Sequence, residues 1–219
     1  MTKTLCYWFI GLLVGLAATQ TQASELSQPE KLVRDTTNEV LERLEANKAA
    51  LDENPDRVAK LVGELVLPHF DFRAMSQMVL AQNWRRASTE QRERFVAAFR
   101  GLLIHTYGSS LSEYSGQRIA FKPMHSNPDS GRATVSMAIQ PDDGPSIPVA
   151  YELYQPEGSE WKVFDVVVDG VSLVQNYRSS FASEARKKGL DELIERIEER
   201  NKGRAVSAKD DPAGSAESP

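Results

Sequence analysis

Apolar residues recur at helical spacing through the first half of the chain. Over residues 29–50 they fall on one stripe of a helix. A second helix is expected after Asn54, where proline occupies the first helical position, and a third after Asp71, a typical N-cap residue. Ser88 and Gln91 match the capping box, in which each side chain bonds the other residue's backbone N–H. They predict the start of a long fourth helix.

From Gly116 the pattern changes to a period of two, which is typical of β-strands. Four strands are predicted, over residues 117–122, 132–140, 147–153 and 161–168. The connections contain Pro, Gly, Asn and Asp, the residue types of tight turns, so successive strands should form an antiparallel meander. The order of helices, strands and again helices predicts an α+β fold, in which helices wrap a curved sheet of about four strands.

The last predicted strand leads without a gap into a helix. Strict alternation predicts two largely apolar strand faces, one with Trp161, Val163, Asp165 and Val167 and the other with Phe164, Val166 and Val168. Asp169 and Gly170 end the strand. Ser172 and Gln175 repeat the capping-box pattern and predict a helix that runs to a stop at Gly189, before a final amphipathic helix.

The first residues have the character of a secretion signal rather than of a fold. Lys3 precedes an apolar run over residues 5–18, too short to span a bilayer, and small residues lie at positions 21 and 23. We expect a cleaved signal peptide over residues 1–23, one α+β domain over 24–200 and a disordered polar tail over 201–219. The alternative for the first segment is a retained membrane anchor.

Composition narrows the classes of function. The lone cysteine, Cys6, lies in the expected signal peptide, so the mature chain has no thiol for a disulfide, for catalysis or for metal binding. A secreted chain without cysteine fits a bacterial periplasm. The net charge of −5 argues against nucleic acid as a partner, because nucleic acid requires a basic surface.

Sequence motifs for catalysis or metal binding are absent. The chain has no zinc-protease H-E-x-x-H, no G-x-S-x-G elbow and no phosphate-binding loop, and its three histidines lie far apart. We therefore expect no catalytic residue and no metal site.

Asp165 allows two interpretations, because it is a carboxylate inside an apolar strand. A buried Asp acts as a general base in some isomerases, here with Tyr107 or Tyr151 as a partner. Otherwise it caps backbone groups or pairs with an arginine such as Arg178, and we favour this structural role.

The order and spacing of many short motifs resemble one family over about residues 31–200. The resemblance is carried by residues 68–72 (PHFDF), Met75, Leu80, Trp84, Arg85, residues 88–91, Phe95, Phe99, Thr106 and Tyr107. Its most specific part is residues 161–165 (WKVFD), residues 169–173 (DGVSL), residues 176–178 (NYR), Phe181, Gly189, Leu190, Asp191, Leu193 and Ile194. On these residues the chain resembles the MlaC (toluene-tolerance) family of periplasmic phospholipid-binding proteins.

The resemblance implies a lipid shuttle without enzymatic activity. It implies an apolar pocket between sheet and helices, phospholipid as bound cargo, and no cofactor. The implied partners are an inner-membrane ABC transporter complex with an MCE-type subunit and an outer-membrane lipoprotein–porin complex. The implied role is to maintain the lipid asymmetry of the outer membrane.

Apolar residues on the expected inward faces are the candidate lipid-binding residues. They are Met75, Phe99, Leu103, Val135, Met137, Val149, Tyr151, Phe164 and Val166. The sequence leaves open which face of the sheet lines the pocket. It also leaves two rival functions, an isomerase or dehydratase that uses Asp165, and a periplasmic chaperone or adaptor.

Overall fold

The computed structural model describes residues 26–48, 56–112, 116–124 and 128–210. The helices are α1 (Gln28–Ala46), α3 (Asp56–Leu65), α4 (Phe72–Leu80), α5 (Gln82–Arg86), α6 (Thr89–Ser112), α7 (Leu173–Lys188) and α8 (Leu190–Asp210), with short 3-10 turns at Leu67–His69 and Pro128–Ser130. The strands are β1 (Arg118–Phe121), β2 (Arg132–Gln140), β3 (Ile147–Tyr154), β4 (Lys162–Val168) and β5 (Val171–Ser172). The expected signal peptide and the Asn54 cap lie outside the described residues.

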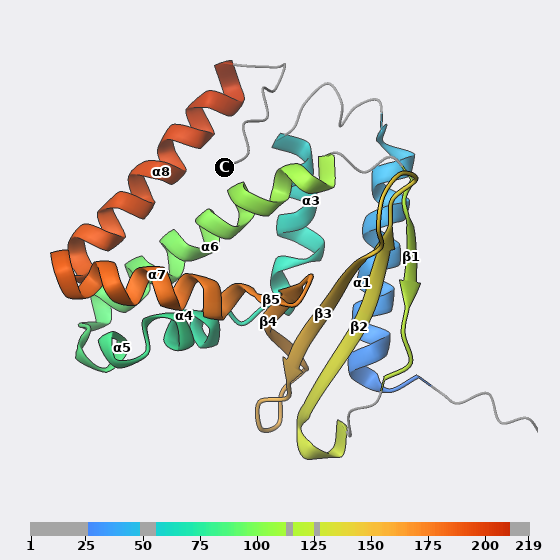
Figure 1. The fold of residues 1–219 in the computed structure, drawn as a ribbon, viewed down its shortest axis with the longest axis horizontal. Coiled ribbons are helices and arrows are strands. Elements are labelled where there is room, and N and C mark those ends of the chain that lie inside the picture. The colour runs from blue at the N-terminus through green and yellow to red at the C-terminus, as the bar shows by residue number, and fades with distance from the viewer. Residues whose placement is uncertain (1–25, 49–55, 113–115, 125–127, 211–219) are drawn as a thin grey trace, which may run out of the picture.

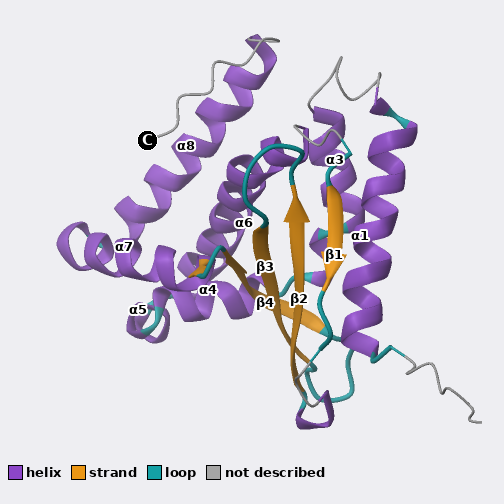
Figure 2. Cartoon of the chain, turned by 45° about the vertical axis from the view of Figure 1, so that its right-hand side comes forward, coloured by secondary structure: helices purple, strands orange, loops and turns teal. Residues whose placement is uncertain are grey.

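The five strands form one antiparallel meander in the order β1-β2-β3-β4-β5, so the predicted α+β class and sheet are confirmed. The fifth strand is a two-residue addition that the sequence pattern did not predict. Helix α1 runs alongside β1 and β2, while α4 to α8 gather at the other end of the sheet, near β4 and β5 (Figures 1 and 2). The helices therefore form two groups around the sheet, and α3 lies between them in contact with both α1 and α6.

A β-bulge in β4 corrects the predicted strand faces. Asp165 pairs with Glu152 and Val163 pairs with Leu153, so Phe164 is the extra residue without a partner on β3. The bulge interrupts the period of two, and Val163 and Val166 join one hydrophobic cluster instead of lying on opposite faces. Phe164 lies outside that cluster.

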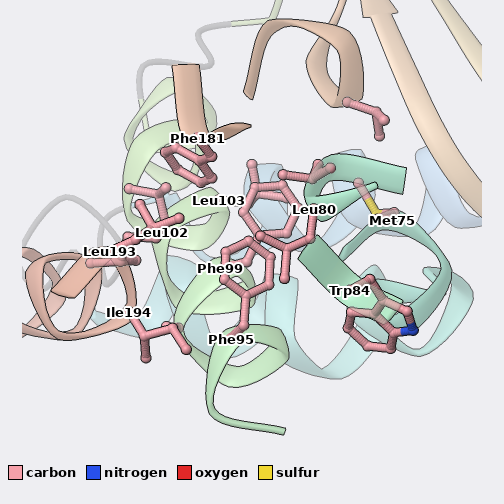
Figure 3. Close-up of a cluster of buried hydrophobic side chains, with 14 residues drawn as sticks. Met75, Leu80, Trp84, Phe95, Phe99, Leu102, Leu103, Phe181, Leu193 and Ile194 are labelled. Carbon is pink, nitrogen blue, oxygen red and sulfur yellow. The ribbon is translucent and has the colours of Figure 1, made fainter. Parts of the chain in front are cut away.

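The second helical group encloses the largest hydrophobic cluster (Figure 3). Phe95 and Phe99 stack at 5.7 Å between ring centroids, and Phe181 of α7 meets the Phe95 ring edge-on at 6.1 Å. Offset and edge-on arrangements are the favoured geometries of aromatic pairs. We call this cluster, whose members come from α4 to α8, the helical core.

The predicted helix caps position α4, α6 and α7. Asp71 Oδ1 accepts a hydrogen bond from Ala74 N at 2.8 Å, and Ser172 Oγ accepts one from Gln175 N at 3.0 Å. At α6 the capping box is complete, because Ser88 Oγ accepts from Gln91 N at 3.1 Å and Gln91 Oε1 accepts from Ser88 N at 3.0 Å.

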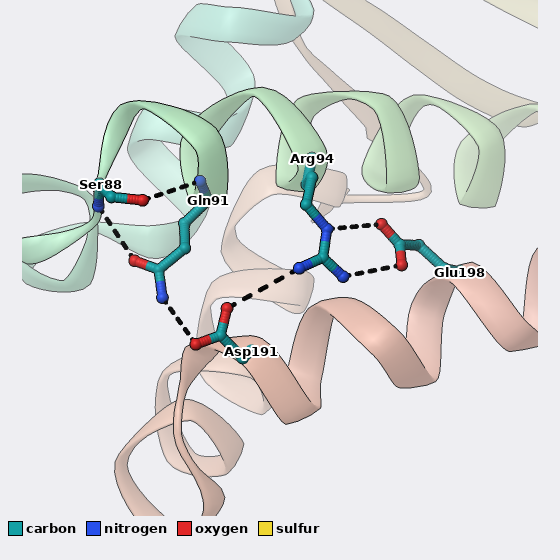
Figure 4. A network of polar contacts seen from close by, with 5 residues as sticks. All are labelled: Ser88, Gln91, Arg94, Asp191 and Glu198. Carbon is teal, nitrogen blue, oxygen red and sulfur yellow. Dashed lines mark hydrogen bonds and ion pairs between the residues drawn. The ribbon is translucent and has the colours of Figure 1, made fainter.

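Polar contacts then tie α6 to α8 (Figure 4). The Gln91 side chain donates to Asp191, and Arg94 forms a two-bond ion pair with Glu198. The Arg94 hydrogen bond lowers the pKa of the Glu198 carboxyl.

Helix α8 extends past the predicted end of the domain. It continues to Asp210, whereas the sequence predicted a disordered tail from Asn201. Asn201 Nδ2 donates to the backbone carbonyl of Ala98 in α6 at 2.9 Å, so a polar contact anchors the helix where its apolar stripe has ended. Residues 211–219 lie outside the described residues.

Candidate functional site

An apolar cavity of about 510 Å³ lies between α1 and one face of the sheet. Its volume falls in the usual range of ligand pockets, roughly 300–1,000 Å³. Its walls come from α1, all strands from β1 to β4 and the segment that precedes α4. The lining residues are Leu32, Val33, Thr36, Thr37, Val40, Leu41, Val66, His69, Phe70, Gln117, Ile119, Met137, Ile139, Pro141, Ile147, Tyr151 and Val163.

The local sequence explains why this space stays open. The inward stripe of α1 alternates aliphatic residues with the short side chains of Thr36 and Thr37. Opposite it, the strands present Ile139 and Tyr151 from the sheet face that α1 covers. This α1 stripe carries no aromatic side chain, in contrast to the interlocked rings of the helical core. The space between α1 and the sheet therefore stays partly unfilled.

A polar groove of about 690 Å³ adjoins the cavity. The two spaces share Leu32, Thr36 and His69, so the lining changes from mainly apolar to mainly polar residues at these three positions. The groove is lined by Gln28, Lys31, Leu32, Asp35, Thr36, Glu39, His69, Gln155, Gly158, Ser159, Glu160 and Trp161. It therefore offers charges of both signs at the edge of an apolar space.

His69 lies at this junction. Desolvation by burial lowers its pKa, and the nearby Lys162 ammonium lowers it further. Lys162 is itself held by a 2.9 Å hydrogen bond from Nζ to the carbonyl of Pro68. At neutral pH the imidazole is therefore uncharged, and it is available for hydrogen bonding at the junction.

Two of the candidate residues, Met137 and Tyr151, line the cavity. Val135, Val149 and Val166 lie on the same face of the sheet and are buried in the cluster beside the cavity. The alternation along β2 and β3 correctly grouped Val135 with Met137 and Val149 with Tyr151. We define this cluster, with Val33 and Trp161, as the sheet core.

The other four candidates lie elsewhere. Met75, Phe99 and Leu103 belong to the helical core, which is closed by aromatic packing. Phe164, displaced by the bulge, lies between the Arg132 guanidinium at 5.4 Å from its ring centroid and the Tyr154 ring at 5.7 Å. Helical spacing shows that a residue is buried, but it does not show whether the buried face meets a core or a cavity.

The largest contribution that sequence reasoning missed is the wall formed by α1. Leu32, Thr36 and Thr37 line the cavity, and none was a candidate. The apolar stripe of this helix was visible in the sequence, and the two threonines within it were the available signal. A short polar residue on an apolar stripe leaves space that a leucine would fill.

Asp165 has a structural role. It is 7% exposed, and its Oδ1 accepts hydrogen bonds from Val166 N at 2.8 Å and Val174 N at 3.1 Å. Ser172 Oγ donates to its second oxygen. The carboxylate thus joins β4 to the start of α7, which agrees with the interpretation that it caps backbone groups.

The sheet also separates Asp165 from Tyr151, one of its two proposed catalytic partners. Asp165 lies opposite Glu152 on β3, whereas Tyr151 lies opposite Val166. Because neighbouring residues of a strand point to opposite faces, Tyr151 and the Asp165 carboxylate are on different sides of the sheet. They do not form an acid–base pair.

Neither a metal cluster nor a membrane-spanning helix is present in the part of the chain that the structure describes. Among these residues no three His, Cys, Asp or Glu side chains come together as metal ligands. No described helix is both long and apolar enough to cross a bilayer. His125 lies outside the described residues.

The fold and the cavity define a class of α+β proteins in which one helix and a curved sheet enclose an apolar space. The model of the MlaC protein family matches residues 34–199. The chain belongs to the MlaC family, as the motifs in the sequence predicted.

Relatives agree with this assignment. The chain is 34% identical over 182 residues to the toluene tolerance protein ttg2D of Pseudomonas putida, which covers 83% of the chain and 84% of the relative. It is 26% identical over 197 residues to the intermembrane phospholipid transport system binding protein MlaC of Haemophilus influenzae, with 88% and 92% covered. Both matches extend over nearly whole proteins.

A solved structure shares the fold. It is the phospholipid-binding protein of Ralstonia solanacearum in complex with a phospholipid, which matches with a TM-score of 0.75 and 26% identity. The match covers 82% of this chain and 99% of that protein.

Proposed function

We propose that this protein binds a phospholipid in the cavity between α1 and the sheet and carries it between membranes. The observation that carries the proposal is an apolar cavity of about 510 Å³ in a chain whose relative in Ralstonia solanacearum has a phospholipid bound. The cavity offers acyl chains an apolar environment, while the chain as a whole carries a net charge of −5.

The energetics of lipid transfer require such a cavity. Two acyl chains of about 15 methylenes each, at about 0.8 kcal/mol per buried CH₂, correspond to roughly 24 kcal/mol of transfer free energy. Free phospholipid therefore leaves a bilayer rarely. A carrier must provide comparable dry surface without a permanently exposed apolar patch, which would promote aggregation.

The two adjoining spaces orient the proposed ligand. Acyl chains occupy the apolar cavity, and the headgroup lies in the polar groove beyond Leu32, Thr36 and His69. The reverse orientation is disfavoured, since it would bury a phosphate among aliphatic side chains. The glycerol esters then lie near the junction.

The proposed place of action is the periplasm, after removal of the signal peptide over residues 1–23. We propose an inner-membrane ABC transporter complex with an MCE-type subunit and an outer-membrane lipoprotein–porin complex as partners. The proposed role is to maintain outer-membrane lipid asymmetry. Family membership and the relative named for intermembrane phospholipid transport support this proposal.

The structure favours neither rival function. Asp165 is engaged by backbone and serine donors, on the side of the sheet away from Tyr151. The proposed binding site is an internal cavity, whereas a chaperone for unfolded clients requires an exposed apolar surface.

Mass spectrometry of protein purified without detergent tests the proposal. We expect a co-purified phospholipid at a fixed stoichiometry, and uptake of phospholipid from liposomes by the delipidated protein. Absence of both would contradict the proposal. A stoichiometric complex with an unfolded client and no lipid would favour the chaperone function instead.

A further inference from the structure

Tyr151 differs in its hydrogen bonding from Tyr107, Tyr154 and Tyr177. The Tyr154 hydroxyl donates to Asp71 Oδ2, and the Tyr107 hydroxyl shares a hydrogen bond with Tyr177. Tyr151 lines the apolar cavity, and its hydroxyl has no hydrogen-bond partner among the residues that the structure describes. Burial alone raises its pKa to about 12, so the hydroxyl stays protonated and can donate.

A hydroxyl that borders an apolar cavity without an acceptor is unfavourable, because the apolar walls offer it no hydrogen bond. Phenylalanine would line an apolar cavity without that cost. A tyrosine at this position is therefore explained best by an acceptor that the ligand supplies. A phospholipid carries two such acceptors next to its acyl chains, the carbonyl oxygens of its two esters.

Tyr151 lies inside the cavity rather than in the adjoining polar groove. Leu153, two residues further along β3, pairs with Val163, and Val163 forms a bridge with Phe70, the neighbour of His69. Two residues of a strand span about 7 Å. Tyr151 thus lies that distance along β3 from the residue next to Val163 and Phe70, and it lines the cavity but not the groove.

We propose that the Tyr151 hydroxyl donates a hydrogen bond to an ester carbonyl of the bound lipid, and that the protein thereby prefers ester-linked over ether-linked phospholipids. The proposal rests on the proposed function and deepens it. It makes Tyr151 a specificity-determining residue within a cavity whose described walls are otherwise mainly aliphatic.

A competition experiment tests this inference. Delipidated protein is incubated with vesicles that contain equal amounts of a diacyl and a dialkyl phosphatidylcholine of the same chain length, and the bound lipids are counted by mass spectrometry. We expect about tenfold enrichment of the diacyl lipid in the parent protein, the order of one buried hydrogen bond. Tyr151→Phe should bring the ratio close to that of the vesicles. Tyr107→Phe, at an exposed residue outside the cavity, should keep the parent ratio.

Infrared spectra of the parent protein loaded with lipid labelled at the ester carbonyls give a readout without any substitution. One carbonyl band should shift to lower frequency than in an apolar solvent. Equal ratios in parent and Tyr151→Phe, or no shifted band, would overturn the inference while leaving phospholipid binding intact. Failure to take up either lipid would overturn the proposed function as well.

Discussion

The helical core is closely packed, whereas a cavity remains between the sheet core and α1, although both regions are lined mainly by apolar side chains. In the helical core, Phe95, Phe99 and Phe181 interlock, and Phe95 and Phe99 are fully buried. Between the sheet core and α1, about 510 Å³ remains open although the walls are mostly aliphatic. The aromatic rings fill one region, whereas aliphatic and threonine side chains on α1 leave the other unfilled.

This difference separates stability from binding. A close-packed core tolerates little change in volume, whereas a cavity wall already lacks contacts on one side. Substitutions in the helical core should therefore change the free energy of unfolding, and substitutions at the cavity should change lipid uptake. The following predictions test that separation.

Phe99→Ala should have the largest effect. Removal of a fully buried ring leaves a void among aromatic neighbours, and we expect a loss of about 4 kcal/mol in the free energy of unfolding. Urea denaturation of delipidated protein measures it. The matched substitution Ile139→Ala on the cavity wall should cost about half as much. Equal losses would show that the two regions do not differ in packing.

Asp165→Asn tests the connection between β4, which belongs to the sheet core, and the start of α7, which belongs to the helical core. The amide keeps the volume but weakens charge-assisted bonds from Val166 N and Val174 N, so we expect a loss of about 2–3 kcal/mol in stability. The amount of lipid bound per folded molecule should stay the same. Unchanged stability together with loss of a measured enzymatic turnover would instead support the isomerase hypothesis.

Ile139→Trp should reduce lipid uptake without unfolding the protein. The indole extends into the cavity and removes volume from an acyl chain, so we expect about a tenfold loss of uptake, which corresponds to about 1.4 kcal/mol. Uptake of a fluorescent phospholipid from liposomes measures the effect. Gln140→Trp, on the next residue of β2 and therefore on the opposite face, is the control. An equal loss in both variants would place the ligand elsewhere.

The smallest expected effect concerns the headgroup. Asp35 and Glu39 line the polar groove, so they should favour a headgroup that carries an ammonium. From mixed vesicles the parent should take phosphatidylethanolamine about threefold over phosphatidylglycerol, which is typical of exposed charge pairs. The double variant Asp35→Asn with Glu39→Gln should lose this preference.

Glu42→Gln with Glu45→Gln, at exposed residues of α1 outside the groove, provides the charge-matched control. This control should keep the parent preference, and added salt should weaken the preference in every form that has it. An unchanged ratio in the groove variant would exclude the groove as the headgroup site.

Local signals predicted most of the secondary structure. The capping residues Ser88, Asp71 and Ser172 mark true helix starts, because a cap depends only on residues within one turn. The alternation of apolar and polar residues predicted β2 over residues 132–140, and the structure shows the same bounds. The bulge at Phe164 was not predicted, since an extra residue in one strand is visible only against its partner.

The sequence alone determined the α+β class, the antiparallel meander, the helix caps and, through its spaced motifs, the family. Each depends on contacts between residues near in the chain, or on a pattern that the chain itself displays. Only the tertiary structure decided which apolar stripe borders empty space and which is filled. Met75 and Phe99 look like Met137 and Tyr151 in a hydrophobicity pattern, yet the first pair closes a core and the second lines a cavity. That outcome depends on the volumes of side chains that distant segments bring face to face.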